Sequence, residues 1–125
     1  MEKYLKSFLE RYDTIEAISI TDKDGIDISA AFGFEDSLIK SSQSAVIFAA
    51  AFMQTNEHLT KLNAGKAKSI TLFYENYIVY QESWDGILLN IFAQPDSNVA
   101  KIYEVAAKIK ENLKFLNETV KKLQQ

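Results

Sequence analysis

Apolar and polar residues alternate along the chain with two periods, one typical of helices and one typical of strands. In residues 2–12 the apolar side chains recur every three or four positions, which predicts a helix. Residues 15–20 (IEAISI) are rich in β-branched side chains and predict a strand, and residues 26–32 (IDISAAF) alternate strictly and predict a second one, joined to the first by Asp24–Gly25 in a hairpin. The core face of this second strand is expected to consist of Ile26, Ile28, Ala30 and Phe32.

A long apolar segment follows and predicts a helix over residues 37–62. Asp36 or Ser37 is a candidate for its N-cap, and Asn63 and Gly65 mark its end. One stripe of this helix can cover the protein's own sheet, and it consists of Leu38, Ala45, Ala49, Phe52 and Leu59.

Three strands then follow in close succession. Residues 68–74 and 77–83 flank a turn at Glu75–Asn76, and the second of these strands ends near Gly86. Residues 87–93 (ILLNIFA) are apolar on both faces, which predicts a central strand that is covered on both sides.

The last helix is expected to begin at Ser97 or Asn98, after Pro95. Its apolar residues follow a heptad spacing over about three repeats, which favours packing on the sheet over a coiled coil. The stripe consists of Ala106, Ile109, Leu113, Leu116, Val120 and Leu123. The element order α-β-β-α-β-β-β-α predicts an α+β fold, a five-stranded antiparallel sheet with helices on both faces. We expect residues 1–125 to form a single domain.

The long helix is apolar on more than its sheet-facing side. At 100° per residue, Ile47 and Ala51 point away from the stripe, and a one-sheet domain of this size has no second layer to cover them. We therefore expect this side to contact a second protein chain, the alternative being that the flanking helices cover it. The candidate dimer-interface residues of the helix are Ser44, Ile47, Phe48, Ala51, Gln54 and Thr55.

The strand after the long helix is a candidate edge strand. It is uncharged beyond Lys68, and an unprotected edge of this kind pairs readily with another chain. A helix contact beside an edge contact would extend the sheet across two subunits. The candidate interface residues of this strand are Lys68, Ser69, Ile70, Thr71 and Leu72.

Composition narrows the function classes. The net charge of −3 argues against a protein that binds nucleic-acid phosphates. The absence of cysteine excludes disulfides, thiolate nucleophiles and zinc sites built on cysteine. The longest apolar run, AVIFAAAFM at 45–53, is shorter than the roughly 20 residues that span a bilayer, so any membrane location must come through a partner.

Three stretches were candidates for site chemistry. The segment SITDKDGIDIS at 19–29 places three aspartates around Gly25, but the ligand spacing of a calcium loop fails in both registers, so the segment is interpreted as a turn. The segment NAGKAKS at 63–69 lacks the spacing of a phosphate loop. His58 has no nucleophile and orienting group arranged around it in the sequence. We predict no catalytic, cofactor-binding or metal site, and no enzyme activity.

The residues that carry a family resemblance are AISITDKDGIDI (17–28), Lys61–Leu62, KSI (68–70), Tyr74, Tyr77, Val79 and Gln81. With these motifs the chain resembles the roadblock/LC7 family over essentially its whole length, without large insertions. Within that family it is similar to the MAP kinase scaffold subunits of Ragulator complexes.

The resemblance implies a profilin-like roadblock fold that dimerises through the long helix and the following strand, in one continuous sheet. It implies a non-enzymatic scaffold that forms a heterodimer with another roadblock protein beside other Ragulator-like subunits. Such a complex recruits Rag-type GTPases for TORC1 signalling and gathers a MAP kinase kinase with its MAP kinase. A lipid-modified partner would hold this cytoplasmic protein at late endosomes or lysosomes.

Two alternatives stay open at the level of the sequence. Within the family, the chain could be a homodimeric regulator of a small GTPase or a dynein light-chain-like adaptor. Outside it, a PAS-like sensor would hold a ligand in a pocket lined by Phe73, Tyr80 and Phe92, although packing in an aromatic core accounts for the same residues.

Overall fold

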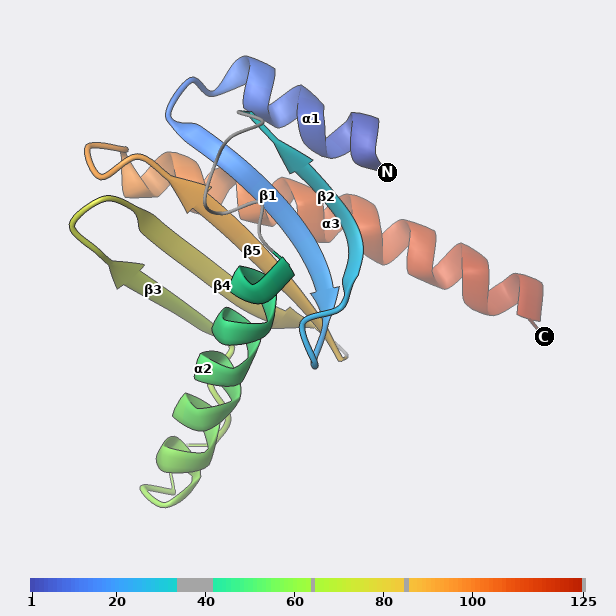
Figure 1. Cartoon of the computed structure of the whole chain (residues 1–125). Coiled ribbons are helices and arrows are strands. Elements are labelled where there is room, and N and C mark those ends of the chain that lie inside the picture. The colour runs from blue at the N-terminus through green and yellow to red at the C-terminus, as the bar shows by residue number, and fades with distance from the viewer. Residues whose placement is uncertain (34–41, 64, 85, 125) are drawn as a thin grey trace.

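The computed structural model describes residues 1–33, 42–63, 65–84 and 86–124, with the backbone alone for residues 42–45 and 115–124. The predicted order of helices and strands is confirmed (Figure 1). The elements are α1 (Glu2–Arg11), β1 (Ile15–Asp22), β2 (Asp27–Phe32), α2 (Ser42–Thr60), β3 (Ser69–Phe73), β4 (Ile78–Trp84), β5 (Ile87–Ala93) and α3 (Val99–Gln124).

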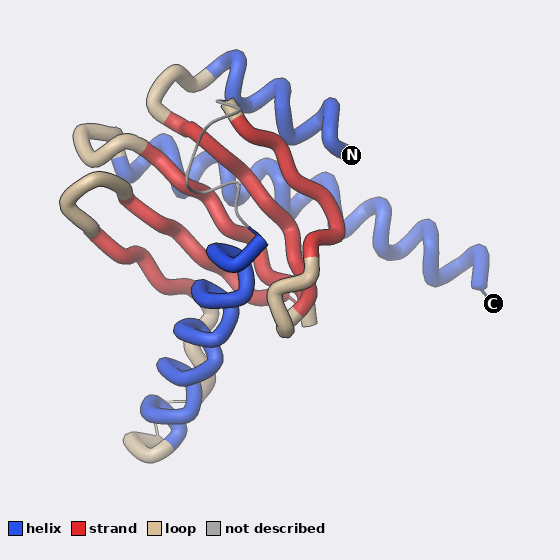
Figure 2. Tube along the Cα trace, viewed as in Figure 1, coloured by secondary structure: helices blue, strands red, loops and turns tan. Residues whose placement is uncertain are grey.

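The five strands form one antiparallel sheet in the order β2-β1-β5-β4-β3. β5 is the central strand, as its continuous apolar sequence predicts, and almost all of its residues are buried. Helices α1 and α3 lie on one face of the sheet, and α2 crosses the other (Figures 1 and 2). The two edges of the sheet are therefore β2 and β3.

The larger part of the core lies between the sheet and the helices α1 and α3. Leu5 of α1 and Ile109 of α3 are fully buried against Ile18, Leu89 and Ile91 of the sheet. Full burial of one such aliphatic side chain contributes about 1.5–3 kcal/mol, so this layer supplies most of the hydrophobic stabilisation.

The predicted sheet-facing stripe of α3 is confirmed for the side chains that the structure describes. Ala106 and Ile109 are buried in the core and Leu113 packs against it, whereas the side chains of Leu116, Val120 and Leu123 lie outside the description. Of the two candidates, Asn98 is the N-cap of α3, because its Oδ1 accepts a hydrogen bond of 2.9 Å from the amide of Ala100. Ser97 instead donates through its hydroxyl to the carbonyl of Thr14, 3.4 Å away.

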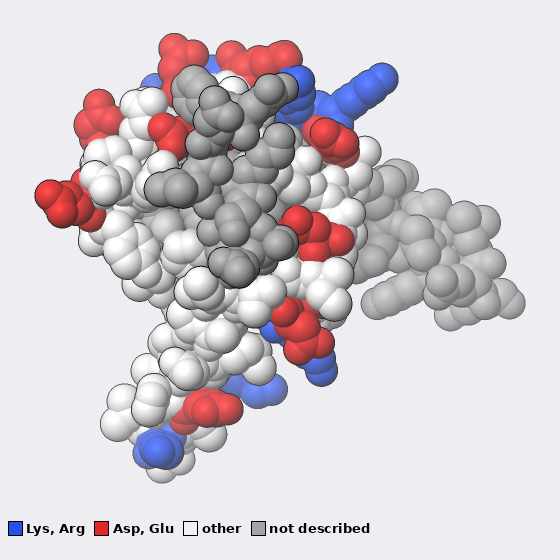
Figure 3. All heavy atoms as spheres, viewed as in Figure 1, with Lys and Arg blue, Asp and Glu red and all other residues white. Residues whose placement is uncertain are grey.

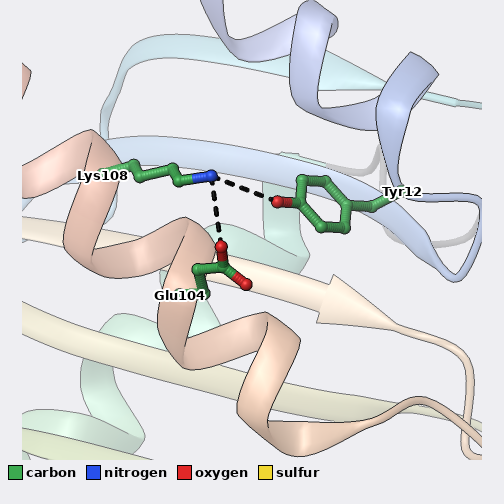
Figure 4. Close-up of polar contacts among 3 residues, drawn as sticks. All are labelled: Tyr12, Glu104 and Lys108. Carbon is green, nitrogen blue, oxygen red and sulfur yellow. Dashed lines mark hydrogen bonds and ion pairs between the residues drawn. The ribbon is translucent and has the colours of Figure 1, made fainter.

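A polar contact also joins α3 to the residue that follows α1 (Figure 4). Lys108 Nζ lies 3.3 Å from a carboxylate oxygen of Glu104 and donates to the hydroxyl of Tyr12 at 3.4 Å. These two partners, Glu104 before Tyr12, raise the pKa of the Lys108 ammonium. The contact lies where α3 passes the end of α1.

The turn between β1 and β2 has the predicted chemistry. The carboxylate of Asp22 accepts hydrogen bonds from the amides of Asp24 at 2.9 Å and Ile26 at 3.0 Å, and Gly25 has a φ of 88°. An aspartate that closes a turn onto its own backbone, followed by a glycine with positive φ, is ordinary turn geometry. Across the part of the chain that the structure describes, no group of three or more His, Cys, Asp or Glu side chains is arranged to hold a metal ion.

The predicted core face of β2 is wrong for two of its four residues. Ile26 and Ile28 are 64% and 58% exposed, Ala30 and Phe32 are half-buried, and the buried residue is Ala31 on the other face. Strict alternation identifies which side chains share a face, but it does not show whether a helix covers that face. In addition, the register between β1 and β2 shifts at this point, because Ile20 is opposite Ser29 and Thr21 is opposite Asp27, so Ile28 lies in a bulge.

Helix α2 ends where the sequence predicts. Asn63 has a φ of 55° and Gly65 a φ of 84°, both in the left-handed region that closes helix C-termini. The predicted N-caps Asp36 and Ser37 lie outside the described residues, as does Leu38. None of the described helices combines the length and the hydrophobicity needed to cross a membrane.

Candidate dimerisation surface

β3 is an edge strand, as the sequence predicts. The amide of Tyr74 donates to the carbonyl of Tyr77 at 2.8 Å, and that of Ser83 donates to the carbonyl of Lys68 at 3.0 Å. In an antiparallel pair, hydrogen-bonded and non-hydrogen-bonded residues alternate. With the observed register, even-numbered residues of β3 turn their backbone groups toward β4. The amides and carbonyls that point away from the sheet are those of Ser69, Thr71 and Phe73.

The side chains of β3 divide between the two faces. Ile70 and Leu72 are half-buried on the side of α2, where they pack against the cores that α2 helps to form. Thr71 lies on the opposite side, with its hydroxyl 3.1 Å from that of Tyr103. Of the candidate residues in this segment, Lys68 and Ser69 are exposed. The backbone groups at the edge of β3 are therefore free to pair with another strand, while its alternate side chains Ile70 and Leu72 pack against the protein's own core.

Helix α2 packs on the sheet by one side, and the described side chains of its other side are exposed or half-buried. Ala49 and Phe52 are buried against Leu88, and Phe48 packs edge-on against Phe92 with ring centroids 5.3 Å apart. Phe48, a candidate interface residue, is thus half-buried and contributes to the protein's own packing.

The outer side of α2 carries the exposed candidate residues. Ile47 is 64% exposed and Gln54 is exposed as well, while Ala51 and Thr55 are half-buried and the side chain of Ser44 lies outside the description. The alternative that flanking helices cover this side is wrong for the described residues, because α1 and α3 lie on the other face of the sheet (Figure 1).

Three exposed apolar residues of α2 belong to the same surface and were missed by sequence reasoning: Val46, Ala50 and Met53. Phe73 of β3 is exposed as well, but its side chain lies on the α3 side of the sheet, so it adjoins the open edge and not the outer side of α2. The three on α2 follow the i, i+4, i+7 spacing of one helix side, which could have found them. Phe73 could not be assigned in this way, because its exposure depends on β3 being the last strand of the sheet.

The outer side of α2 is uncharged from Val46 to Thr55. Figure 3 shows a largely uncharged surface over this helix, with charged atoms near its C-terminal end. His58 is an exposed residue at that end. An apolar, uncharged helix side next to a free strand edge is suited to a protein–protein contact.

A buried row of polar side chains holds α2 in place on the sheet. The Nε2 of Gln81 donates to the backbone carbonyl of Phe48 in α2 at 3.0 Å and to Oδ1 of Asn90 at 2.9 Å. Asn90 in turn donates to the hydroxyl of Ser19 at 3.2 Å. Because these residues are opposite one another in β4, β5 and β1, they form one ladder across the sheet.

Replacement of Gln81 by methionine is expected to lower the free energy of unfolding by about 1–3 kcal/mol, because it leaves the buried acceptors on Phe48 and Asn90 without their donor. The hydroxyl of Thr21 is a matched control, since it is buried and has no hydrogen-bond partner among the described residues. Thr21→Val should therefore be neutral or slightly stabilising. Urea unfolding of both variants checks this, and equal effects of the two substitutions would contradict it.

The aromatic residues proposed for a PAS-like pocket do not gather in one place. Tyr80 lies on the α3 side of the sheet, where burial and the charge of Glu82 raise the pKa of its phenol. Phe73 also lies on this side, whereas Phe92 packs under α2 on the other. The sheet separates them, so they cannot line a common cavity.

Comparison with known proteins agrees with this geometry. A family model described as "Mitogen-activated protein kinase kinase 1 interacting" matches residues 1–122. Among solved structures, Myxococcus xanthus MglB superposes with a TM-score of 0.80 at 12% identity over 94% of each chain. A roadblock/LC7 domain from Streptomyces avermitilis gives 0.77 at 13% identity, covering 93% of this chain and 97% of that one.

Schizosaccharomyces pombe profilin is similar to a lesser degree, with a TM-score of 0.62 at 15% identity over 92% of this chain and 97% of its own. No curated protein sequence matches the chain. At these identities the solved structures establish the fold alone: a roadblock/LC7 architecture of the profilin-like type, as the sequence predicts.

Proposed function

The chain belongs to the mitogen-activated protein kinase kinase 1 interacting family, and from that premise we propose that it is a scaffold subunit that pairs with another roadblock protein through α2 and β3. In this proposal the protein catalyses no reaction and holds other proteins together. The observation that carries it is the uncharged, exposed apolar side of α2 beside the open edge of β3.

The geometry favours a pair that uses both elements at once. A partner strand alongside β3 would meet the outward amides and carbonyls of Ser69, Thr71 and Phe73 and continue the sheet. A partner helix beside α2 would cover Ile47 and Met53, and complete burial of such side chains contributes about 1.5–3 kcal/mol each. Two roadblock chains present the same two elements, so each contact brings the other into register.

The finer function follows from the family rather than from the surface. We infer that the pair belongs to a Ragulator-like complex with further subunits on late endosomes or lysosomes. There it would recruit Rag-type GTPases for TORC1 signalling and bring together a MAP kinase kinase and its MAP kinase. The family description, which names an interaction with a MAP kinase kinase, supports the kinase role. A lipid-modified partner would supply the attachment to the membrane.

Purification of the tagged chain from its own cells, with identification of the proteins that accompany it, tests this proposal. Another roadblock protein in equal amount, together with Rag-type GTPases or a MAP kinase kinase, is the expected result. Light scattering on the co-expressed pair should give the mass of one copy of each. A stable monomer in the presence of every roadblock partner would contradict pairing, and a dimer of this chain alone would favour the homodimeric regulator.

A further inference from the structure

The sheet has a second open edge at β2, on the far side from the proposed pairing strand. The amide of Gly33 donates to the carbonyl of Glu16 at 2.7 Å, and Ile18 is opposite Ala31 in the ladder. Odd-numbered residues of β2 therefore turn their backbone groups toward β1. The amides and carbonyls of Ala30 and Phe32 point outward, where the described part of the chain places no further strand.

The side chains along this edge are also unusual for a free strand. Ile28, in a bulge at the start of the strand, is 58% exposed, and Ile26 in the preceding turn is 64% exposed. Free edges are commonly protected by lysine, proline or a bulge. β2 contains no lysine, arginine or proline, and its one irregularity is a bulge at Ile28, which lies between the paired residues Asp27 and Ser29 and has no partner on β1. Beyond the bulge, residues 29–32 are in regular register beside α1, and the outward amides of Ala30 and Phe32 are available for pairing.

Charge at this edge selects between partners. Asp22, Asp24 and Asp27 lie in and beside the turn that leads into β2, with Lys23 as the one basic residue among them. Asp24 and Asp27 are exposed. Exposed carboxylates next to an apolar strand favour a partner that carries basic side chains, because attraction of opposite charges guides its approach and fixes its register.

We propose that β2 is a second docking edge, which binds an extended segment of a partner chain with alternating aliphatic and basic residues by adding it to the sheet. Backbone hydrogen bonds to Ala30 and Phe32 would hold the segment, Ile28 would contact its aliphatic side chains, and the acidic turn would bind its basic ones. Strands β1, β5 and β4 separate this edge from β3, so the site does not depend on the proposed pairing.

Amide hydrogen exchange followed by NMR tests the proposal directly. The probe is an eight-residue peptide of alternating valine and lysine with blocked ends, and the comparison is the same peptide with glutamate in place of lysine. In the protein alone, the amides of Ala30 and Phe32 should exchange faster than those of Ser29 and Ala31. At saturating lysine peptide their exchange should slow at least about tenfold, and the glutamate peptide should bind at least about tenfold more weakly.

Three outcomes overturn the proposal. The first is that the amides of Ala30 and Phe32 are already as protected as that of Ala31 in the protein alone, which would mean that the chain covers its own edge. The second is that millimolar lysine peptide leaves their exchange unchanged or protects Thr71 and Phe73 of β3 instead. The third is equal binding of the two peptides.

Two variants separate docking from folding. Ala30→Pro removes an outward amide and leaves the hydrogen bonds to β1 intact, so it should abolish peptide binding without lowering the unfolding midpoint. Ile28→Ser changes a mostly exposed side chain and should weaken binding several-fold at unchanged stability. If the Ala30→Pro variant fails to fold, peptide binding by the Ile28→Ser variant tests the proposal on its own. Wild-type affinity in a folded Ile28→Ser variant would contradict the role of the apolar side chain.

Discussion

Replacement of Ile47 by aspartate is expected to abolish pairing with a roadblock partner and to leave the isolated chain folded. In the monomer Ile47 is 64% exposed, so a carboxylate there stays hydrated and costs little. In the proposed pair the same carboxylate would be buried among uncharged residues such as Val46 and Met53 without a partner. Disruption of a central interface residue typically costs about 2–4 kcal/mol, which weakens binding by about 30- to 1,000-fold.

Light scattering and titration calorimetry on the purified variant would measure this loss, and circular dichroism would confirm that the fold is retained. Ile28→Asp is the matched control, because Ile28 is an aliphatic residue of similar exposure on the opposite edge of the sheet. It should pair with wild-type affinity. Unfolding of the Ile47→Asp variant would place this residue in the protein's own core, and loss of pairing in Ile28→Asp would move the interface to β2.

The sequence was sufficient to predict the arrangement of the elements because their apolar patterns differ in period and in continuity. Residues 87–93 are apolar on both faces apart from Asn90, and the strand is central. Residues 69–73 lack that continuity on both faces, and the strand lies at the edge. The family resemblance predicts the same fold. The end of the long helix was also predictable, because Asn63 and Gly65 are residues that adopt the left-handed conformation, as they do here.

What the sequence did not supply is the extent to which each face is covered. The sequence of β2 alternates strictly, yet Ile28 is exposed in a bulge that interrupts the register with β1. Phe48 is a candidate interface residue by its position on α2, and the structure adds that it is half-buried and packs on Phe92. A helical or strand period gives directions around an element, whereas burial depends on bulges and on where the neighbouring elements lie.

The polar residues of the interior are a second case. Gln81 and Asn90 interrupt apolar strands, and pattern alone gives no reason for them. Their role becomes evident only when the ladder across the sheet brings them together beneath the carbonyl of Phe48. Gln81 is also one of the residues that carry the family resemblance. Its contact lies beneath α2, the helix proposed to pair, and supports that helix from the sheet.

Replacement of Phe52 by alanine is expected to have the opposite consequence to the substitution at Ile47, although both residues belong to α2. Phe52 is 1% exposed and packs with Ala49 on Leu88. Removal of a buried phenylalanine ring typically costs about 3–5 kcal/mol, which is a large part of the roughly 5–15 kcal/mol that stabilises a domain. Urea unfolding should show a midpoint lower by about 1 M or more.

Met53→Ala is the control for this loss, since Met53 follows Phe52 directly and is exposed on the outer side of the helix. It should change the unfolding midpoint little and weaken pairing measurably. A midpoint that falls equally in both variants would mean that the outer side of α2 is covered by the chain itself. An unchanged midpoint in Phe52→Ala would mean that α2 holds its place without the contact to β5. If Phe52→Ala lowers stability and Met53→Ala weakens pairing, then stability depends on one side of α2 and partner binding on the other. The proposed scaffold requires this arrangement.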